Sequence, residues 1–131
     1  VIKNLVVHCS DSPQGRGDNA ETIHRWHLEK GWDGIGYNSV ILEDGTIEQG
    51  RPLYWKGSHV GALNSISLGV CLIGLGGDAT EEQLLSLREV LMQWLNLYPD
   101  AWVLGHTDLD PGKTCPGFDV AQWWKDVNDY D

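Results

Sequence analysis

Positive charge is scarce in this sequence. Nine Lys and Arg residues stand against 19 Asp and Glu residues, so the formal net charge is −10. A nucleic-acid binder needs clustered cations that neutralise the phosphate backbone, and this composition therefore argues against a nucleic-acid partner. The negative charge also opposes unassisted adhesion to anionic membranes or cell walls, so a polymeric substrate must be held by a specific groove.

Long apolar runs are missing as well. No segment approaches the roughly 18 consecutive apolar residues that a membrane-spanning helix needs, and no n-region or h-region of a signal peptide is recognisable. We therefore expect no membrane association. A length of 131 residues with 41% hydrophobic content favours one globular domain over residues 1–131, large enough to bury a core without disulfides. A monomer is the default expectation.

The cysteines are few and odd in number, which argues against a disulfide framework. Cys9 and Cys71 stand in the apolar, strand-like contexts VVHCS and GVCLIG, and we expect both to be reduced and buried. Cys115 differs, because Gly, Lys, Thr and Pro surround it. The paired C-x₂₋₄-C and H-x₃₋₅-H spacings that are typical of structural zinc sites are absent from the sequence.

Hydrophobic periodicity and turn residues predict strands that alternate with helices. A hairpin is expected around Asp44 and Gly45, with a type I′ turn that requires positive φ at both residues. Capping residues are expected to begin helices at Asn19 or Asp18, at Thr80 and at Asp119. The predicted strands are 1–7, 38–43, 46–50, 68–75 and 101–105, and the predicted helices are 20–30, 81–97 and one that follows residue 119. This order predicts an α/β fold, in which about three helices flank a central mixed sheet.

Two histidines follow predicted strands, at the edge where α/β sheets bind ligands. His8 ends the first strand and His106 follows the last one, while Cys115 lies in the loop after His106. Three neutral or thiolate ligands leave zinc a fourth position for water, so this set predicts a catalytic zinc site at the carboxyl ends of the strands. An ordinary loop with a free thiol is the alternative interpretation.

Most of the sequence also resembles a known family. The segments that carry the resemblance are LVVHCSDS, IHRWHLEKGWDGIGYNSVILEDGTIEQGR, GSHVGALNSISLGVCLIG and GHTDLDPGKTCPGFD. They are similar to the type 2 N-acetylmuramoyl-L-alanine amidases, the family of phage T7 lysozyme and the peptidoglycan recognition proteins. The resemblance implies a zinc-dependent endolysin that hydrolyses the amide bond between N-acetylmuramic acid and L-alanine in peptidoglycan.

Carried over by position, the resemblance implies roles for individual residues. The three candidate ligands would bind Zn²⁺, while Tyr37 and Lys113 would assist catalysis. His59, in GSHVG, resembles a histidine at the rim of the family's substrate groove, although a surface-loop histidine is nearly as good an interpretation. His27 resembles a helix histidine with a packing role, and we expect His24 to face solvent.

Several alternatives stay open at this point. A module that binds peptidoglycan without cleaving it is disfavoured by Cys115, because such family members usually lack the cysteine ligand. Binding of a phage RNA polymerase is an implied additional role, since T7 lysozyme inhibits its polymerase. A cysteine hydrolase that uses Cys9 beside His8 is weak, because adjacent strand residues point to opposite faces. Asp108 and Asp110 are candidates for supporting the ligands. The implied location is the host cytoplasm until release to the periplasm or cell wall.

Overall fold

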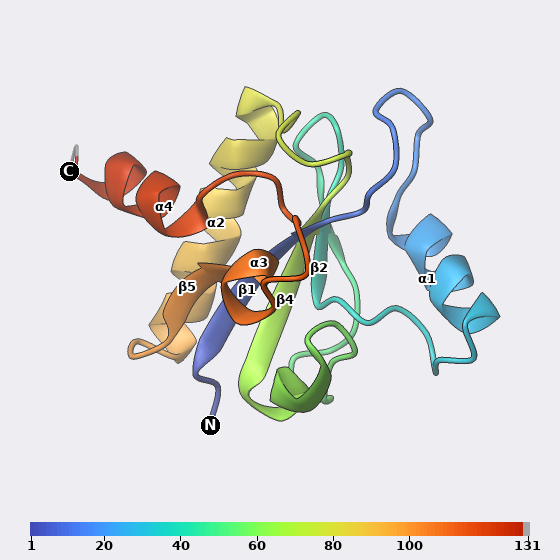
Figure 1. Cartoon of the computed structure of the whole chain (residues 1–131), viewed down its shortest axis with the longest axis horizontal. Coiled ribbons are helices and arrows are strands. Elements are labelled where there is room, and N and C mark those ends of the chain that lie inside the picture. Colours follow the sequence, from blue (N-terminus) through green and yellow to red (C-terminus); the bar gives the residue numbers. More distant parts are fainter. Residues whose placement is uncertain (130–131) are drawn as a thin grey trace.

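One five-stranded sheet forms the centre of the protein, whose computed structural model describes residues 1–129. The strand order is β3-β2-β4-β1-β5 (Figure 1). Strands β2, β4, β1 and β5 are parallel, and β3 pairs antiparallel with β2 at one edge. The bounds are Asn4–Cys9 for β1, Ser39–Ile41 for β2, Ile47–Gln49 for β3, Ser67–Leu72 for β4 and Trp102–Gly105 for β5. The predicted α/β fold with a mixed sheet is therefore confirmed.

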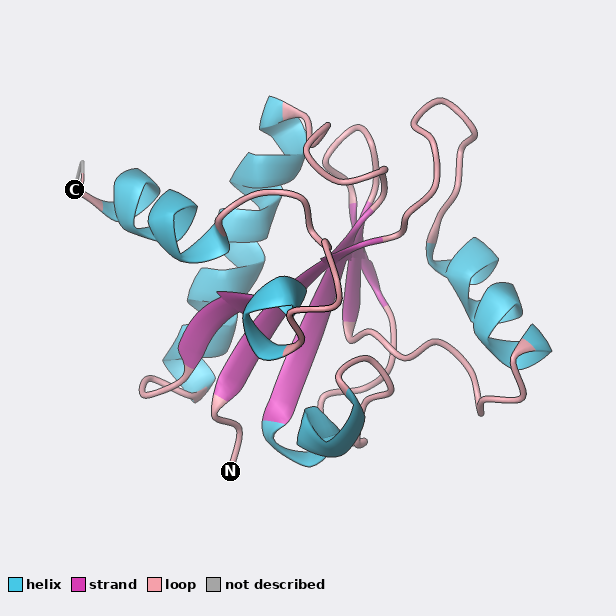
Figure 2. Cartoon of the chain, in the orientation of Figure 1, coloured by secondary structure: helices cyan, strands magenta, loops and turns pink. Residues whose placement is uncertain are grey.

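Helices cover both faces of this sheet, as Figure 2 shows. The longer helices are α1 (Ala20–Glu29), α2 (Glu81–Leu97) and α4 (Val120–Asn128). A single helical turn, α3 (His106–Leu109), follows β5, and a 3₁₀ helix, η1 (Gly61–Ile66), precedes β4. Neither of these two helices is long enough to show a helical period in the sequence. Within residues 1–129, no helix combines the length and the apolarity that crossing a membrane would need.

Alternation along the strands divides the core in two. Leu5 and Val7 of β1 join the larger cluster, in which the sheet packs against α2 and α4. The opposite face packs against α1 in a smaller cluster that contains Ile23, Ile35, Val40, Cys71 and Ile73. Successive strand residues point to opposite faces, so His8 belongs on the α1 side of the sheet.

The turn between β2 and β3 corrects one expectation. Gly45 has a φ of +89°, but Asp44 does not adopt a positive φ, so the predicted type I′ turn is wrong. Gly45 N donates to the Leu42 carbonyl at 2.9 Å, which gives a type I turn followed by a left-handed glycine, another common hairpin connection. The Asp44 carboxylate accepts from Thr46 N at 2.9 Å and stabilises this form.

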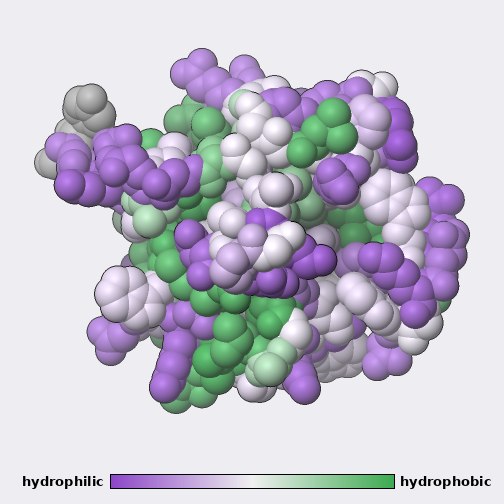
Figure 3. Space-filling model, in the orientation of Figure 1, coloured by the Kyte–Doolittle hydropathy of each residue, from purple (hydrophilic) through white to green (hydrophobic). Residues whose placement is uncertain are grey.

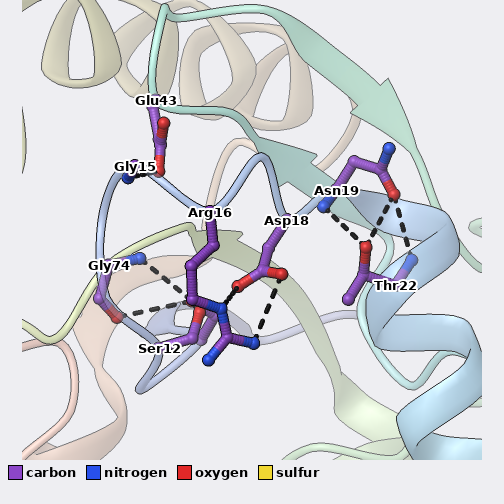
Figure 4. Close-up of polar contacts among 9 residues, drawn as sticks. Ser12, Gly15, Arg16, Asp18, Asn19, Thr22, Glu43 and Gly74 are labelled. Atoms are coloured by element: carbon purple, nitrogen blue, oxygen red, sulfur yellow. Dashed lines mark hydrogen bonds and ion pairs between the residues drawn. The ribbon is translucent and has the colours of Figure 1, made fainter.

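Polar contacts organise the loop between β1 and α1 (Figure 4). Arg16 pairs with the buried carboxylate of Asp18 at 3.2 Å, and Gly15 N donates to the Glu43 carboxylate. Asn19 caps α1, accepting from Thr22 N at 3.0 Å. The loop after β1 is therefore held by contacts with the β2–β3 hairpin and with the first turn of α1.

Gln83 is a fully buried polar residue at the start of α2. Its amide oxygen accepts from Thr80 N at 3.0 Å, which completes the predicted capping box. Its amide nitrogen donates to the carbonyls of Ile41 and Ile73, which end β2 and follow β4. One side chain thus connects the start of α2 to two strands.

We expect Gln83→Leu to lower the free energy of unfolding by about 1–3 kcal/mol, because Thr80 N and the carbonyls of Ile41 and Ile73 each lose one hydrogen bond. Gln122→Leu is the matched control, since Gln122 also lies at the third position of a helix but is exposed; its effect should stay within about 0.5 kcal/mol. Denaturant unfolding of the three proteins measures both values. Equal stability of the two variants would contradict the role given to Gln83.

Candidate metal centre

The structure brings the three predicted ligands together. The ligand atoms of His8, His106 and Cys115 all lie within 4.8 Å of one another. The two imidazole rings have centroids 4.6 Å apart. This cluster lies at the carboxyl ends of the parallel strands, as predicted, and β1 extends one residue beyond His8, to Cys9.

Strand register explains how the two histidines meet. Val7 of β1 pairs with Gly105 of β5 in a parallel ladder, so the next residue of each chain segment is a histidine at the same edge. Gly105 is also the N-cap of α3, and His106 is its first residue. The helical turn directs the chain away from the sheet immediately after the ligand.

Backbone contacts bring Cys115 to the same edge. Thr107 N donates to the Cys115 carbonyl at 3.0 Å, which closes the loop between α3 and α4. Cys9 N donates to Cys115 Sγ at 2.7 Å. The loop is also joined to the segment after β4 by a 3.3 Å hydrogen bond from Gly77 N to the Pro116 carbonyl.

The surroundings of the two candidate histidine ligands favour their neutral form, which is the form that binds a metal. Burial lowers the pKa of His8 well below its usual value, and the neighbouring His59 and His106 lower it further. Burial also lowers the pKa of His106, with Asp110 raising it and Lys113 lowering it. Both rings are thus neutral near pH 7 and offer a lone pair to a metal.

The Cys115 side chain, in contrast, favours its protonated thiol form in the absence of a metal. Its hydrogen bond with the Cys9 thiol and its burial raise its pKa, so a metal must displace the thiol proton when it binds. Two imidazoles and one thiolate suit zinc, whereas Mg²⁺ and Ca²⁺ prefer oxygen ligands. The donor set therefore fits zinc with an open coordination position. Cys9 and Cys71 are buried and form no disulfide bond, as predicted.

A groove of about 960 Å³ lies over the cluster. Its lining includes the three candidate ligands, residues 58–64, Lys30 and Trp32 beyond α1, and residues of the loop between α3 and α4. Figure 3 shows hydrophilic side chains over α1, and also over α4 at the other side of this view. A groove of this size can hold an extended polymer segment, and the metal-ligand cluster lies in its wall.

Tyr37 lies beside the candidate ligands, in the groove. Its ring centroid is 4.9 Å from that of His8. Burial raises the pKa of the phenol well above its usual value, and the nearby cysteines add to the shift. The hydroxyl consequently keeps its proton at neutral pH and can donate a hydrogen bond or a proton.

Lys113 lies at the exposed rim of the same groove. Its charge contributes to the lowered pKa of His106, so the ammonium lies within electrostatic reach of that ring. Asp108 has another task, because its carboxylate accepts from Gly105 N at 2.8 Å and caps α3. Asp110 lines the groove and accepts from Gly112 N at 3.1 Å.

Two histidines of α1 also have assigned contacts. His27 is buried, as predicted, and its Nδ1 accepts from Gly36 N at 2.9 Å. His24 was expected to face solvent, but it is half-buried and accepts from Ile35 N at 3.0 Å. The backbone N–H groups of Ile35 and Gly36 have no strand partner, so the two histidines provide their hydrogen-bond acceptors. Both histidines thus hold the segment that leads to Tyr37.

Sequence reasoning missed Arg51. Its guanidinium donates to the carbonyls of Ile35 and Lys56 and to the Ser58 hydroxyl at 3.3 Å. Its backbone N–H donates to the Tyr37 carbonyl at 2.7 Å. Arg51 therefore joins the two segments that form one wall of the groove, and a single arginine after a strand carries no signal of such a role.

Comparison with known proteins agrees with this arrangement. The model of the family described as N-acetylmuramoyl-L-alanine amidase matches residues 1–118. The chain belongs to this amidase family. Among its curated relatives, the endolysin of Klebsiella phage KP32 is 40% identical to this chain over 129 residues. The match covers 92% of this chain and 84% of the relative. The endolysin of Escherichia phage T7 is 37% identical over 128 residues, with the same two coverages.

Solved structures support the fold of this amidase-family chain. The N-acetylmuramoyl-L-alanine amidase LysC from Clostridium intestinale URNW superposes with a TM-score of 0.87 at 27% identity, covering 98% of this chain and 85% of that one. PGRP-SA of the bumblebee has a TM-score of 0.84 at 24% identity, covering 97% and 82%, and this second likeness concerns the fold alone. The family resemblance inferred from sequence is confirmed.

The buried His27 predicts a pH-dependent stability. Burial lowers its pKa to about 4, with Lys30 and Arg51 adding to the shift, whereas an unfolded histidine titrates near about 6.5. The unfolded chain therefore binds a proton first as the pH falls from 6.5 to 4, and the free energy of unfolding decreases over that window. His27→Asn keeps an acceptor at the δ position but does not titrate.

We expect the free energy of unfolding of the parent to fall more steeply than that of His27→Asn between pH 6.5 and 4, by up to about 3 kcal/mol. Urea unfolding at half-unit pH steps measures the two slopes. Parallel curves would show that His27 is not buried in its neutral form.

Proposed function

We propose that this chain is a zinc-dependent N-acetylmuramoyl-L-alanine amidase that hydrolyses the bond between N-acetylmuramic acid and L-alanine in peptidoglycan, as a phage endolysin. The observation that carries the proposal is the convergence of His8, His106 and Cys115 within 4.8 Å in the wall of a groove. Family membership and the endolysin relatives support the amidase reaction. The donor set supports the metal.

Each proposed ligand contributes its own chemistry. His8 and His106 would bind zinc as neutral imidazoles, and Cys115 would bind as a thiolate after releasing its proton. When bound there, zinc supplies a Lewis acid and generates a nucleophile from water at neutral pH. Strand ends and a closed loop hold all three ligands, so the metal site requires little rearrangement of the backbone.

Tyr37 and Lys113 would act on the charge that develops during amide cleavage. The Tyr37 hydroxyl stays protonated because burial raises the pKa of the phenol, so it can donate to the scissile carbonyl oxygen or to the departing amine. The Lys113 ammonium would stabilise negative charge on the carbonyl oxygen. Asp108, a candidate for supporting the ligands, accepts from the backbone N–H of Gly105, the residue before His106.

The recognition-only alternative is weaker on this geometry. A module that only binds peptidoglycan has no need of a cysteine beside two neutral histidines, yet Cys115 Sγ lies in this cluster and accepts a backbone hydrogen bond from Cys9. Action on the wall after release from the host cytoplasm is proposed from the endolysin relatives. Binding of a phage RNA polymerase stays a prediction that rests on the sequence resemblance.

Digestion of purified muropeptides with and without a chelator tests the proposal directly. We expect mass spectrometry to detect a free peptide that begins with L-alanine and an intact lactyl-bearing sugar, and we expect chelation to abolish both products and added zinc to restore them. Binding without cleavage would move the protein to the recognition class. Cleavage that resists chelation would remove the metal from the reaction.

Two substitutions separate metal binding from turnover. Cys115→Ala should lose zinc and activity together. Tyr37→Phe should retain zinc while turnover falls about 10²-fold or more, because a positioned donor is lost. Tyr54→Phe is the control for the tyrosine substitution, since Tyr54 is 84% exposed outside the groove, and it should match the parent. Metal analysis beside kinetics gives the result, and full activity in either test variant would exclude that residue from the mechanism.

A further inference from the structure

His59 makes a direct contact with a proposed metal ligand. Its Nδ1 lies 2.9 Å from Nε2 of His8. The two rings meet edge to face, with centroids 5.0 Å apart and an interplanar angle of 83°. The His59 nitrogen is thus within hydrogen-bond distance of Nε2 of His8, so that the other His8 nitrogen, Nδ1, is left for a metal.

Two glycines make the space that the His59 ring occupies. A Cβ at Gly57 would lie 2.7 Å from His59 Cδ2, and a Cβ at Gly69 would lie 2.8 Å from both Cε1 and Nδ1. Neither glycine has a positive φ, so the backbone conformation does not require glycine at these positions. The requirement is room for the imidazole, which these glycines confine on two sides.

The backbone of His59 is held as well. Asn64 Oδ1 accepts from both His59 N and Val60 N, at 2.9 and 2.8 Å. His59 Nε2 is buried and has no hydrogen-bond partner among the described residues, whereas Nδ1 contacts His8, so neither ring nitrogen is exposed in the groove. These contacts favour a role toward His8 over the role in substrate binding that the sequence resemblance implies for His59.

We propose that His59 is a positioning residue for the metal centre, which accepts the Nε2 proton of His8 and so holds the His8 ring with Nδ1 directed to the metal. The proposal rests on the proposed zinc site. A neutral imidazole has one donor and one acceptor nitrogen, and a metal-binding histidine usually donates its second N–H to a fixed acceptor. In this chain another histidine provides that acceptor.

A pair of isosteric variants tests the hydrogen bond. Asn and Leu have side chains of the same shape, but only Asn places an acceptor at the δ position that His59 Nδ1 occupies. We expect His59→Leu to raise the zinc dissociation constant about 10- to 100-fold, whereas His59→Asn should remain within about threefold of the parent. Competition with a chromophoric chelator measures these constants without any assay of hydrolysis.

A second readout uses the unmodified protein with zinc bound. Long-range ¹H–¹⁵N NMR spectra distinguish protonated, unprotonated and metal-bound ring nitrogens. We expect His8 to carry its proton on Nε2 and to bind zinc through Nδ1. In His59→Leu, the Nε2 proton should exchange faster with water, and His59→Asn should restore the parent signal.

The outcomes separate this inference from the proposed function. Zinc binding by the parent with an unchanged dissociation constant in His59→Leu would overturn the positioning role alone, as would coordination through His8 Nε2. A parent that binds no zinc would overturn the metal centre itself. If His59→Leu does not fold, the NMR spectrum of the parent still decides which His8 nitrogen carries the proton.

Discussion

The parallel pairing of β1 between β4 and β5 is the constraint on which the site depends. Parallel strands end at the same edge of a sheet, and the register sets His8 beside the residue that starts α3. The pairing brings together two imidazoles that are 98 residues apart in the sequence. A change of one residue in that register would turn His8 toward the opposite face, into the core beneath α2.

Burial at this edge has chemical consequences. The same desolvation that keeps His8 and His106 neutral keeps the phenol of Tyr37 protonated, so two imidazoles with free lone pairs lie beside a hydroxyl that keeps its proton. Buried polar groups are costly unless they have partners. His59 provides one for His8, and the groove wall is held in turn by Arg51.

Local sequence signals located most of the helices and strands. The capping residues Asn19, Thr80 and Asp119 begin α1, α2 and α4 as predicted, because a cap is a contact within one turn of the helix. Strand ends were less accurate: β1 begins three residues later and ends two residues later than predicted, and β4 ends at Leu72 rather than at residue 75. Strand limits depend on the neighbouring strand, which a local pattern does not contain. The turn at Asp44 was wrong because its side chain stabilises another turn type.

The sequence by itself determined the fold class, the family and the three candidate ligands, because these follow from residue types, periodicity and motifs that extend over nearly the whole chain. The tertiary structure decided how the ligands are held. The contact of His59 with His8, the space left by Gly57 and Gly69, and the contact of Cys9 with Cys115 each join residues from separate segments. Such contacts depend on distances of a few ångströms between distant parts of the chain, and no local pattern of residues specifies them.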